Sequence, residues 1–164
     1  MLITGASTGI GAATARHAHA EGYNLVLAAR TEDKLEALAA ELGGGDVLAQ
    51  PCDVTEWDQV ERLASATEER FGTPDVVFAN AGFGASRGFM EESPEHWRSM
   101  VLTNVLGVAL TIRATLPKVL ERGTGHYVVT SSVARKLENR AARSSPKAHP
   151  KRWPAPPTLK RPAF

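Results

Sequence analysis

Short apolar runs alternate with longer stretches of helical spacing along most of the 164-residue chain, and this alternation restricts the fold more than any other feature. Strands joined through helices pair in parallel within one sheet, by right-handed crossovers. Helices then cover both faces of the sheet, so its strands are apolar throughout. The sequence therefore predicts an α/β fold with a doubly wound parallel sheet, whose five strands lie at Leu2–Thr4, Tyr23–Ala29, Asp46–Gln50, Asp75–Asn80 and His126–Ser131.

Four helices are predicted between these strands, from residues that commonly begin and end helices. Thr31 can cap a helix that carries acids in its first turn, and Thr55 and Asp58 have capping-box spacing. Ser93 followed by Pro94 places proline at the first helical position, where its missing N–H costs nothing. The predicted helices cover Ile10–Glu21, residues 31–42, residues 55–71 and residues 94–121.

The composition changes abruptly near Val133. Residues 133–164 hold nine Lys/Arg, one acid, six of the ten prolines and none of the fourteen glycines. Prolines at this density prevent a long helix. We therefore predict a folded domain over residues 1–134, and a disordered, basic, Arg/Pro-rich tail over residues 135–164. The hypothesis that a change of reading frame produced the tail would be tested by sequencing the coding DNA around this junction.

Several classes of protein are disfavoured by composition. A single cysteine, Cys52, rules out an internal disulfide framework and suits a reducing cytosol, so a cytoplasmic location is predicted. The five histidines lack zinc-site spacing, and no metal site is expected. The longest apolar stretch, Val105–Ile112, is too short to cross a bilayer. Nucleic-acid binding by the basic tail is a remote alternative, because Trp153 is its only tryptophan and no folded binding motif accompanies it.

A glycine cluster follows the first predicted strand directly. Gly5, Gly9 and Gly11 are spaced Gly-x-x-x-Gly-x-Gly, which differs from the common Gly-x-Gly-x-x-Gly dinucleotide fingerprint. Glycines allow backbone amides to approach a pyrophosphate, and the following helix N-terminus favours an anion. An ordinary strand-to-helix turn is the alternative. The phosphate-binding residues predicted here are Gly5, Ser7, Thr8, Gly9, Ile10 and Gly11.

Four motifs occur in a fixed order along residues 1–134. They are Thr4–Gly11, Asp53-Val54, Asn80-Ala81-Gly82 and Thr130-Ser131-Ser132, with Asn104 as a fifth matching position. In this order they resemble the amino-terminal part of the short-chain dehydrogenase/reductase family. The resemblance implies a Rossmann-like domain that is incomplete here, a nicotinamide dinucleotide cofactor, and hydride transfer between a small carbonyl or alcohol substrate and that cofactor. The resemblance also implies a homo-oligomer, whose interface would be incomplete in this chain.

The resemblance also implies roles for the cofactor-binding residues. Arg30 ends the second strand, where arginine pairs with the 2′-phosphate of NADP and an acid would instead bind the ribose of NAD. NADP is therefore predicted over NAD, unless Arg30 is only a solvated surface residue. By resemblance Asp53 contacts the adenine and Val54 helps to seat it, although Asp53 could equally form a turn. Asn80, Ala81 and Gly82 border the cofactor, and Asn80 could be structural as much as functional.

The catalytic residues that the resemblance supplies are incomplete. Ser132 would polarise the substrate oxygen, and Asn104 would join a proton relay or simply satisfy a helix kink as a buried amide. The family's Tyr-x-x-x-Lys motif does not occur, since the only tyrosines are Tyr23 and Tyr127. Loss of a positioned general acid costs about 10² to 10⁴ in rate. We therefore predict an oxidoreductase by descent that is inactive as given; a non-catalytic NAD(P)-binding fragment is the alternative.

Overall fold

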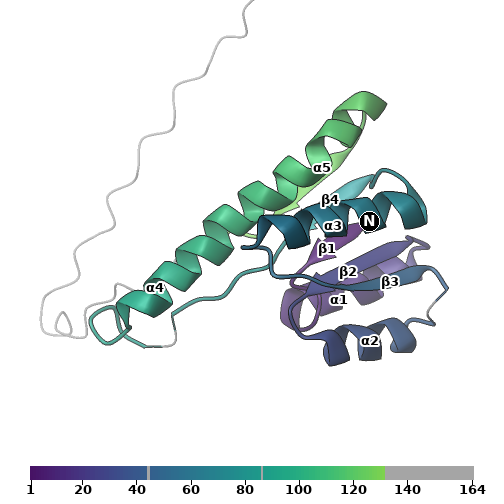
Figure 1. Cartoon of the computed structure of the whole chain (residues 1–164). Helices are drawn as coiled ribbons and strands as arrows, with labels where there is room; N and C mark the ends of the chain where they lie inside the picture. Colours follow the sequence, from purple (N-terminus) through teal and green to yellow (C-terminus); the bar gives the residue numbers. More distant parts are fainter. Residues whose placement is uncertain (44, 86, 132–164) are drawn as a thin grey trace, which may run out of the picture. The chain divides into compact units, whose positions relative to one another are not determined.

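The computed structural model describes residues 1–43, 45–85 and 87–131, which lie in one compact unit, Met1–Ser131. Its five strands are all parallel in the order β3-β2-β1-β4-β5 (Figure 1). They are β1 (Leu2–Thr4), β2 (Leu25–Ala29), β3 (Val47–Pro51), β4 (Val76–Ala79) and β5 (His126–Val129). This Rossmann-like doubly wound arrangement confirms the predicted fold. The predictions for Ser132 and for the tail lie outside the described residues.

Helices connect the strands at the predicted places. They are α1 (Gly9–Ala20), α2 (Glu32–Glu41), α3 (Trp57–Phe71), α4 (Pro94–Val101) and α5 (Val108–Arg122), with a π-helical segment, η1 (Leu102–Gly107), between the last two. Helices α4, η1 and α5 form the one long helix predicted over residues 94–121. The π-helical segment inside it was not predicted.

Alternate residues of the central strands point into two core layers, one on each face of the sheet. On one face Ile3, Leu25 and Leu27 pack with apolar residues of α1 and α2. On the other face Leu2 and Val26 pack with buried residues of α3 and half-buried residues of α5. The two-residue period of a strand produces this division. Because all strand pairs are parallel, the carboxyl ends of the strands lie at one edge of the sheet.

One predicted helix start is confirmed and another is wrong. The Ser93 hydroxyl accepts a hydrogen bond of 3.1 Å from the His96 amide, as a capping residue should. Helix α3 begins at Trp57 with Glu56 as its N-cap and without a side-chain cap, so the predicted capping box at Thr55 does not form. The Thr55 hydroxyl instead donates to Asp53 over 2.9 Å, because the turn after β3 brings this acceptor close.

The helical stretch Pro94–Arg122 corrects the expectation that no segment could cross a bilayer. It is 29 residues long, and its most apolar 18-residue window has a mean hydropathy of 1.5. By length and composition it therefore passes as a candidate span, although 22% of that window is buried in the fold. The sequence argument failed because it counted only uninterrupted apolar residues. One such helix is weak support for a membrane protein, since core helices pass the same test.

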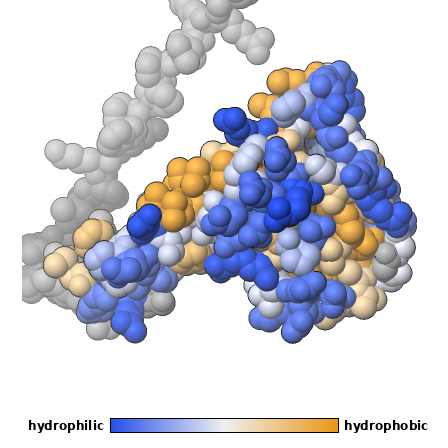
Figure 2. Space-filling view, viewed as in Figure 1, coloured by the Kyte–Doolittle hydropathy of each residue, from blue (hydrophilic) through white to orange (hydrophobic). Residues whose placement is uncertain are grey.

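The outer side of this helix carries exposed apolar residues. Val101 and Val105 are 58% and 64% exposed, whereas Met100 is buried and packs inward. Figure 2 shows apolar surface gathered along the helix between its α4 and α5 ends. Val128 and Val129 of the edge strand β5 are also close to half exposed.

Candidate functional site

The predicted cofactor-binding residues follow the carboxyl ends of neighbouring strands. Strand β1 lies between β2 and β4. The sheet therefore grows in one direction from β1 to β2 and β3, and in the opposite direction from β1 to β4 and β5. Ligands of open α/β sheets bind in the crevice at such a switch point. The residues found at this edge are Gly5–Gly11 after β1, Arg30 after β2, Asp53 and Val54 after β3, and Asn80–Gly82 after β4.

Two glycines allow the turn after β1 to pack closely. Gly5 has a φ of +67°, and a Cβ there would lie 2.8 Å from the Cα of Ala81. A Cβ on Gly11 would overlap the carbonyl oxygen of Gly5 and lie 2.9 Å from Nδ2 of Asn80. The first turn of α1 therefore rests directly on the preceding loop. Any side chain at Gly11 would force the two apart.

The amino end of α1 is open. Thr8 is its N-cap in extended conformation, but no side chain caps the helix and its first turn contains no acid. The first amides of a helix lack intrahelical partners and carry a partial positive charge. Ile10, in the same turn, is 63% exposed. The local structure thus presents N–H donors that suit an anion such as a phosphate group.

Thr4 connects the glycine turn with the end of β4, a role that sequence reasoning missed. Its buried hydroxyl accepts hydrogen bonds from the amides of Asn80 and Ala81 over 3.0 and 3.1 Å. The Asn80 side chain donates to the Thr4 carbonyl over 3.1 Å and accepts from the Thr130 hydroxyl over 2.8 Å. Asn80 therefore ties β1, β4 and the end of β5 together, in agreement with the structural alternative for this residue.

The side chains after β2 and β3 differ in their freedom. Arg30 is exposed and forms no ion pair within residues 1–43, 45–85 and 87–131. Asp53 is half-buried, and its Oδ1 accepts from the amide and hydroxyl of Thr55 over 3.0 and 2.9 Å. Asp53 thus forms a turn, which was the alternative role predicted for it from the sequence. Val54 is buried and belongs to the core layer of α3 and α5.

Asn104 lies in the π-helical segment. Its Oδ1 accepts from the Phe83 amide over 3.1 Å, and its Nδ2 donates to the Phe83 carbonyl over 2.8 Å. The residue is exposed, so the alternative of a buried amide is wrong, although a helix irregularity is present. Single π-helical turns within α-helices occur often at functional sites. Asn104 here holds the segment that follows Asn80–Gly82.

Neither tyrosine lies at this edge of the sheet with a free hydroxyl. The Tyr127 hydroxyl is 3.0 Å from the Thr115 hydroxyl of α5, and Tyr23 precedes β2 at the opposite edge. Cys52 is buried, and burial, reinforced by the charge of Asp53, raises the pKa of its thiol to about 11. It therefore remains a protonated thiol at neutral pH and is a poor nucleophile. Among the described residues no three His, Cys, Asp or Glu side chains gather as metal ligands.

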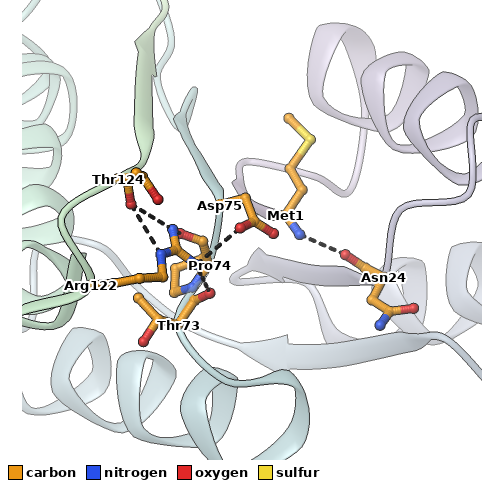
Figure 3. Close-up of polar contacts among 7 residues, drawn as sticks. All are labelled: Met1, Asn24, Thr73, Pro74, Asp75, Arg122 and Thr124. Carbon is orange, nitrogen blue, oxygen red and sulfur yellow. Dashed lines mark hydrogen bonds and ion pairs between the residues drawn. The ribbon is translucent and has the colours of Figure 1, made fainter.

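The opposite, amino-terminal edge of the sheet holds a cavity of about 220 Å³, which none of the predicted cofactor-binding residues lines. Beside it Arg122, at the end of α5, reaches the turn before β4 (Figure 3). Its guanidinium donates to the carbonyl oxygens of Thr73, Pro74 and Thr124 over 2.6–2.9 Å and pairs with Asp75 over 3.0 Å. This cluster fastens the end of α5 to the turn before β4 and to Thr124 before β5.

The fold and the glycine turn define a Rossmann-like α/β domain. A profile of the short chain dehydrogenase family matches residues 1–147, thirteen residues beyond the boundary at 134 that the motifs suggested. The chain therefore belongs to the short-chain dehydrogenase family.

Curated and structural relatives support this membership. An uncharacterized oxidoreductase of Staphylococcus haemolyticus is 38% identical over 133 residues, which are 81% of this chain and 58% of that protein. An alcohol dehydrogenase of Thermococcus sibiricus, solved with 5-hydroxy-NADP, is 42% identical with a TM-score of 0.74 over 80% of this chain and 57% of its own. A Burkholderia phymatum family member solved with NAD is 36% identical, with a TM-score of 0.75 over 80% and 48%. The chain thus spans about half the length of these relatives, between 48% and 58%.

Proposed function

We propose that this chain binds NADP at the carboxyl edge of the sheet, with the pyrophosphate at the amino end of α1. The observation that carries the proposal is the uncapped and acid-free first turn of α1, reached through a glycine turn too close-packed for any side chain at Gly11. The solved relatives with bound 5-hydroxy-NADP and NAD support a nicotinamide dinucleotide as the ligand.

The residues present fit this ligand along its length. Donors from residues 7–11 would meet the phosphates, and Asp53 and Val54 would border the adenine after β3. Ala81 and Gly82 after β4 are small enough for the cofactor to pass closely. When bound, the cofactor supplies hydride chemistry. The chain's own part is to bind and orient it at the switch point of the sheet.

Arg30 is the basis for preferring NADP to NAD. It is exposed at the end of β2 and without an ion pair among the described residues, so its guanidinium is available for a 2′-phosphate. Arginine binds phosphate through two parallel hydrogen bonds, and neither Ala28 nor Ala29 offers a competing acid. We expect Arg30→Ala to weaken NADPH binding by about tenfold to 100-fold and to leave NADH binding within about twofold.

Titration calorimetry with both cofactors measures this difference. Arg98→Ala, which removes another exposed arginine, on α4, is the matched control and should bind NADPH as the parent chain does. Equal losses for NADPH and NADH in Arg30→Ala would contradict a specific role at the 2′-phosphate.

The activity that we propose from family membership is the reduction of small carbonyl compounds or the oxidation of alcohols. By family resemblance Ser132 would polarise the substrate oxygen and Asn104 would join a proton relay, but residues 133–164 contain no tyrosine to donate a proton. We therefore infer that the 164-residue chain holds the cofactor without turnover, as a non-catalytic binding fragment would. A cytoplasmic location remains part of the proposal, and the interface of the family's homo-oligomers would be incomplete in this chain.

Binding and turnover are separated by two measurements on the same preparation. Calorimetry with NADPH is expected to give saturable binding. Absorbance at the NADPH band with a panel of aldehydes and ketones is expected to stay constant. Steady NADPH consumption that depends on the carbonyl compound would overturn the inferred inactivity, and absence of binding to a chain with a cooperative melt would overturn the proposed site.

A further inference from the structure

Gly107, the last residue of the π-helical segment, lies against the loop after β3. It is buried, and a Cβ built on it would lie 2.5 Å from Cγ2 and 3.1 Å from Cβ of Val54. The hydroxyl of Thr111, one turn later, donates to the Gly107 carbonyl over 2.7 Å. The helix backbone therefore touches Val54 directly, with no side chain between them.

Val54 has little freedom to move away from this contact. It is only 5% exposed and packs in the core layer with Val60 and Leu63 of α3. Valine is branched at Cβ and has few accessible rotamers. Its neighbour Asp53 is held through both its backbone and its side chain, since its amide donates to Gln59 over 2.9 Å and its carboxylate accepts from Thr55. A shift of Val54 would therefore move the whole turn after β3.

The same π-helical segment reaches the other end of the site. Three residues before Gly107, Asn104 binds the backbone of Phe83, and a Cβ on Gly82 would lie 3.0 Å from the Asn104 Oδ1. One short segment thus contacts the loop after β3 through Gly107 and the loop after β4 through Asn104. The two loops lie on opposite sides of β1 in the sheet.

We propose that Gly107 is a positioning residue for the adenine end of the cofactor site. Its lack of a side chain lets the π-helical segment set the place of Val54 and, through it, of Asp53. This inference rests on the proposed function, because it takes the turn after β3 as the adenine-binding loop. Gly107 itself touches no ligand and acts through Val54.

The test uses adenosine 2′,5′-bisphosphate, a probe that contains only the adenine end of NADP, with the full chain in titration calorimetry. Gly107→Ala is expected to weaken binding by about tenfold, because the new methyl group displaces Val54. The double variant Val54→Ala/Gly107→Ala removes the Cγ2 atom that the methyl meets. It is expected to bind within about threefold of Val54→Ala alone.

Two controls separate positioning from general loss of stability. Val77→Ala opens a gap in the same core layer away from the turn after β3, and it should lower the melting temperature while leaving probe affinity unchanged. Gly45→Ala adds a methyl group in open space and should change neither property. Rescue in the double variant shows that the methyl group acts through the contact with Val54, and unchanged probe affinity in Val77→Ala shows that a loss of stability alone does not weaken binding.

Each outcome decides one of the two proposals. Failure of the folded parent chain to bind the probe defeats the proposed function. Binding by Gly107→Ala equal to the parent defeats the positioning role while leaving the site intact. If Gly107→Ala does not fold, the double variant decides: recovery of folding and binding supports the contact with Val54, and failure to recover while Val54→Ala binds overturns it.

Discussion

Thr4→Val is expected to lower the free energy of unfolding by about 2–4 kcal/mol, which corresponds to roughly 10 °C in melting temperature for a domain of this size. Valine matches threonine in shape, so the core layer is unchanged. It removes the only side-chain acceptor seen for the amides of Asn80 and Ala81 in the described part of the chain. Each partly buried N–H that loses its partner carries its own desolvation cost. Thermal denaturation followed by circular dichroism measures the difference.

The chain offers a matched control for this substitution. Thr67 is as fully buried as Thr4, but its hydroxyl donates only to the Leu63 carbonyl over 2.7 Å, an oxygen that helix α3 also uses. Thr67→Val should therefore cost under about 1 kcal/mol. NADPH affinity should fall in Thr4→Val and stay unchanged in Thr67→Val, because only Thr4 aligns the glycine turn with β4. Equal losses of stability in the two variants would contradict the bridging role of Thr4.

Gly11→Ala is expected to reduce NADPH affinity by at least about 100-fold and to destabilise the fold by about 3 kcal/mol. A methyl group at this position would overlap the carbonyl oxygen of Gly5, and backbone atoms cannot rotate aside as a side chain can. The first turn of α1 would move away from the loop after β1. The amides of residues 7–11, which the proposed function assigns to the phosphates, would then be displaced.

Calorimetry with NADPH and a melting curve measure the two effects. Gly45→Ala is the control, because a Cβ there meets nothing within 4 Å and its φ is not positive. It should match the parent in both measurements. A folded Gly11→Ala chain with parental affinity would show that the phosphates do not bind at the amino end of α1, and the proposed function would fail with it.

The sequence alone was sufficient to predict the strands of the sheet and the residues that follow their carboxyl ends, because both depend on local patterns. Apolar runs and helix-ending glycines located all five strands, although β2 begins at Leu25 and not at Tyr23. Tyr23 is 43% exposed, and its amide donates to the Ala18 carbonyl, so it closes the end of α1 before the strand starts. A tyrosine beside apolar residues gives no local sign of that difference.

Features that depend on distant residues were not predictable in the same way. The hydroxyl of Thr4 binds amides 76 and 77 residues away, and no spacing rule relates such positions. The capping box at Thr55 failed because Asp53, two residues earlier, competes for the same hydroxyl. No residue pattern in the sequence distinguishes the π-helical segment from the α-helices on either side of it. Its two contacts, Asn104 with Phe83 and Gly107 with Val54, require the fold to be assembled first.

Helix α5 is anchored at each of its two ends. At one end the π-helical segment abuts Val54, and at the other the guanidinium of Arg122 grips the turn before β4. Because both of its ends are held, helix α5 cannot pivot about one end relative to the sheet. The glycine turn after β1, packed against Ala81, therefore lies beside a helix that is fastened to the same sheet at both of its ends.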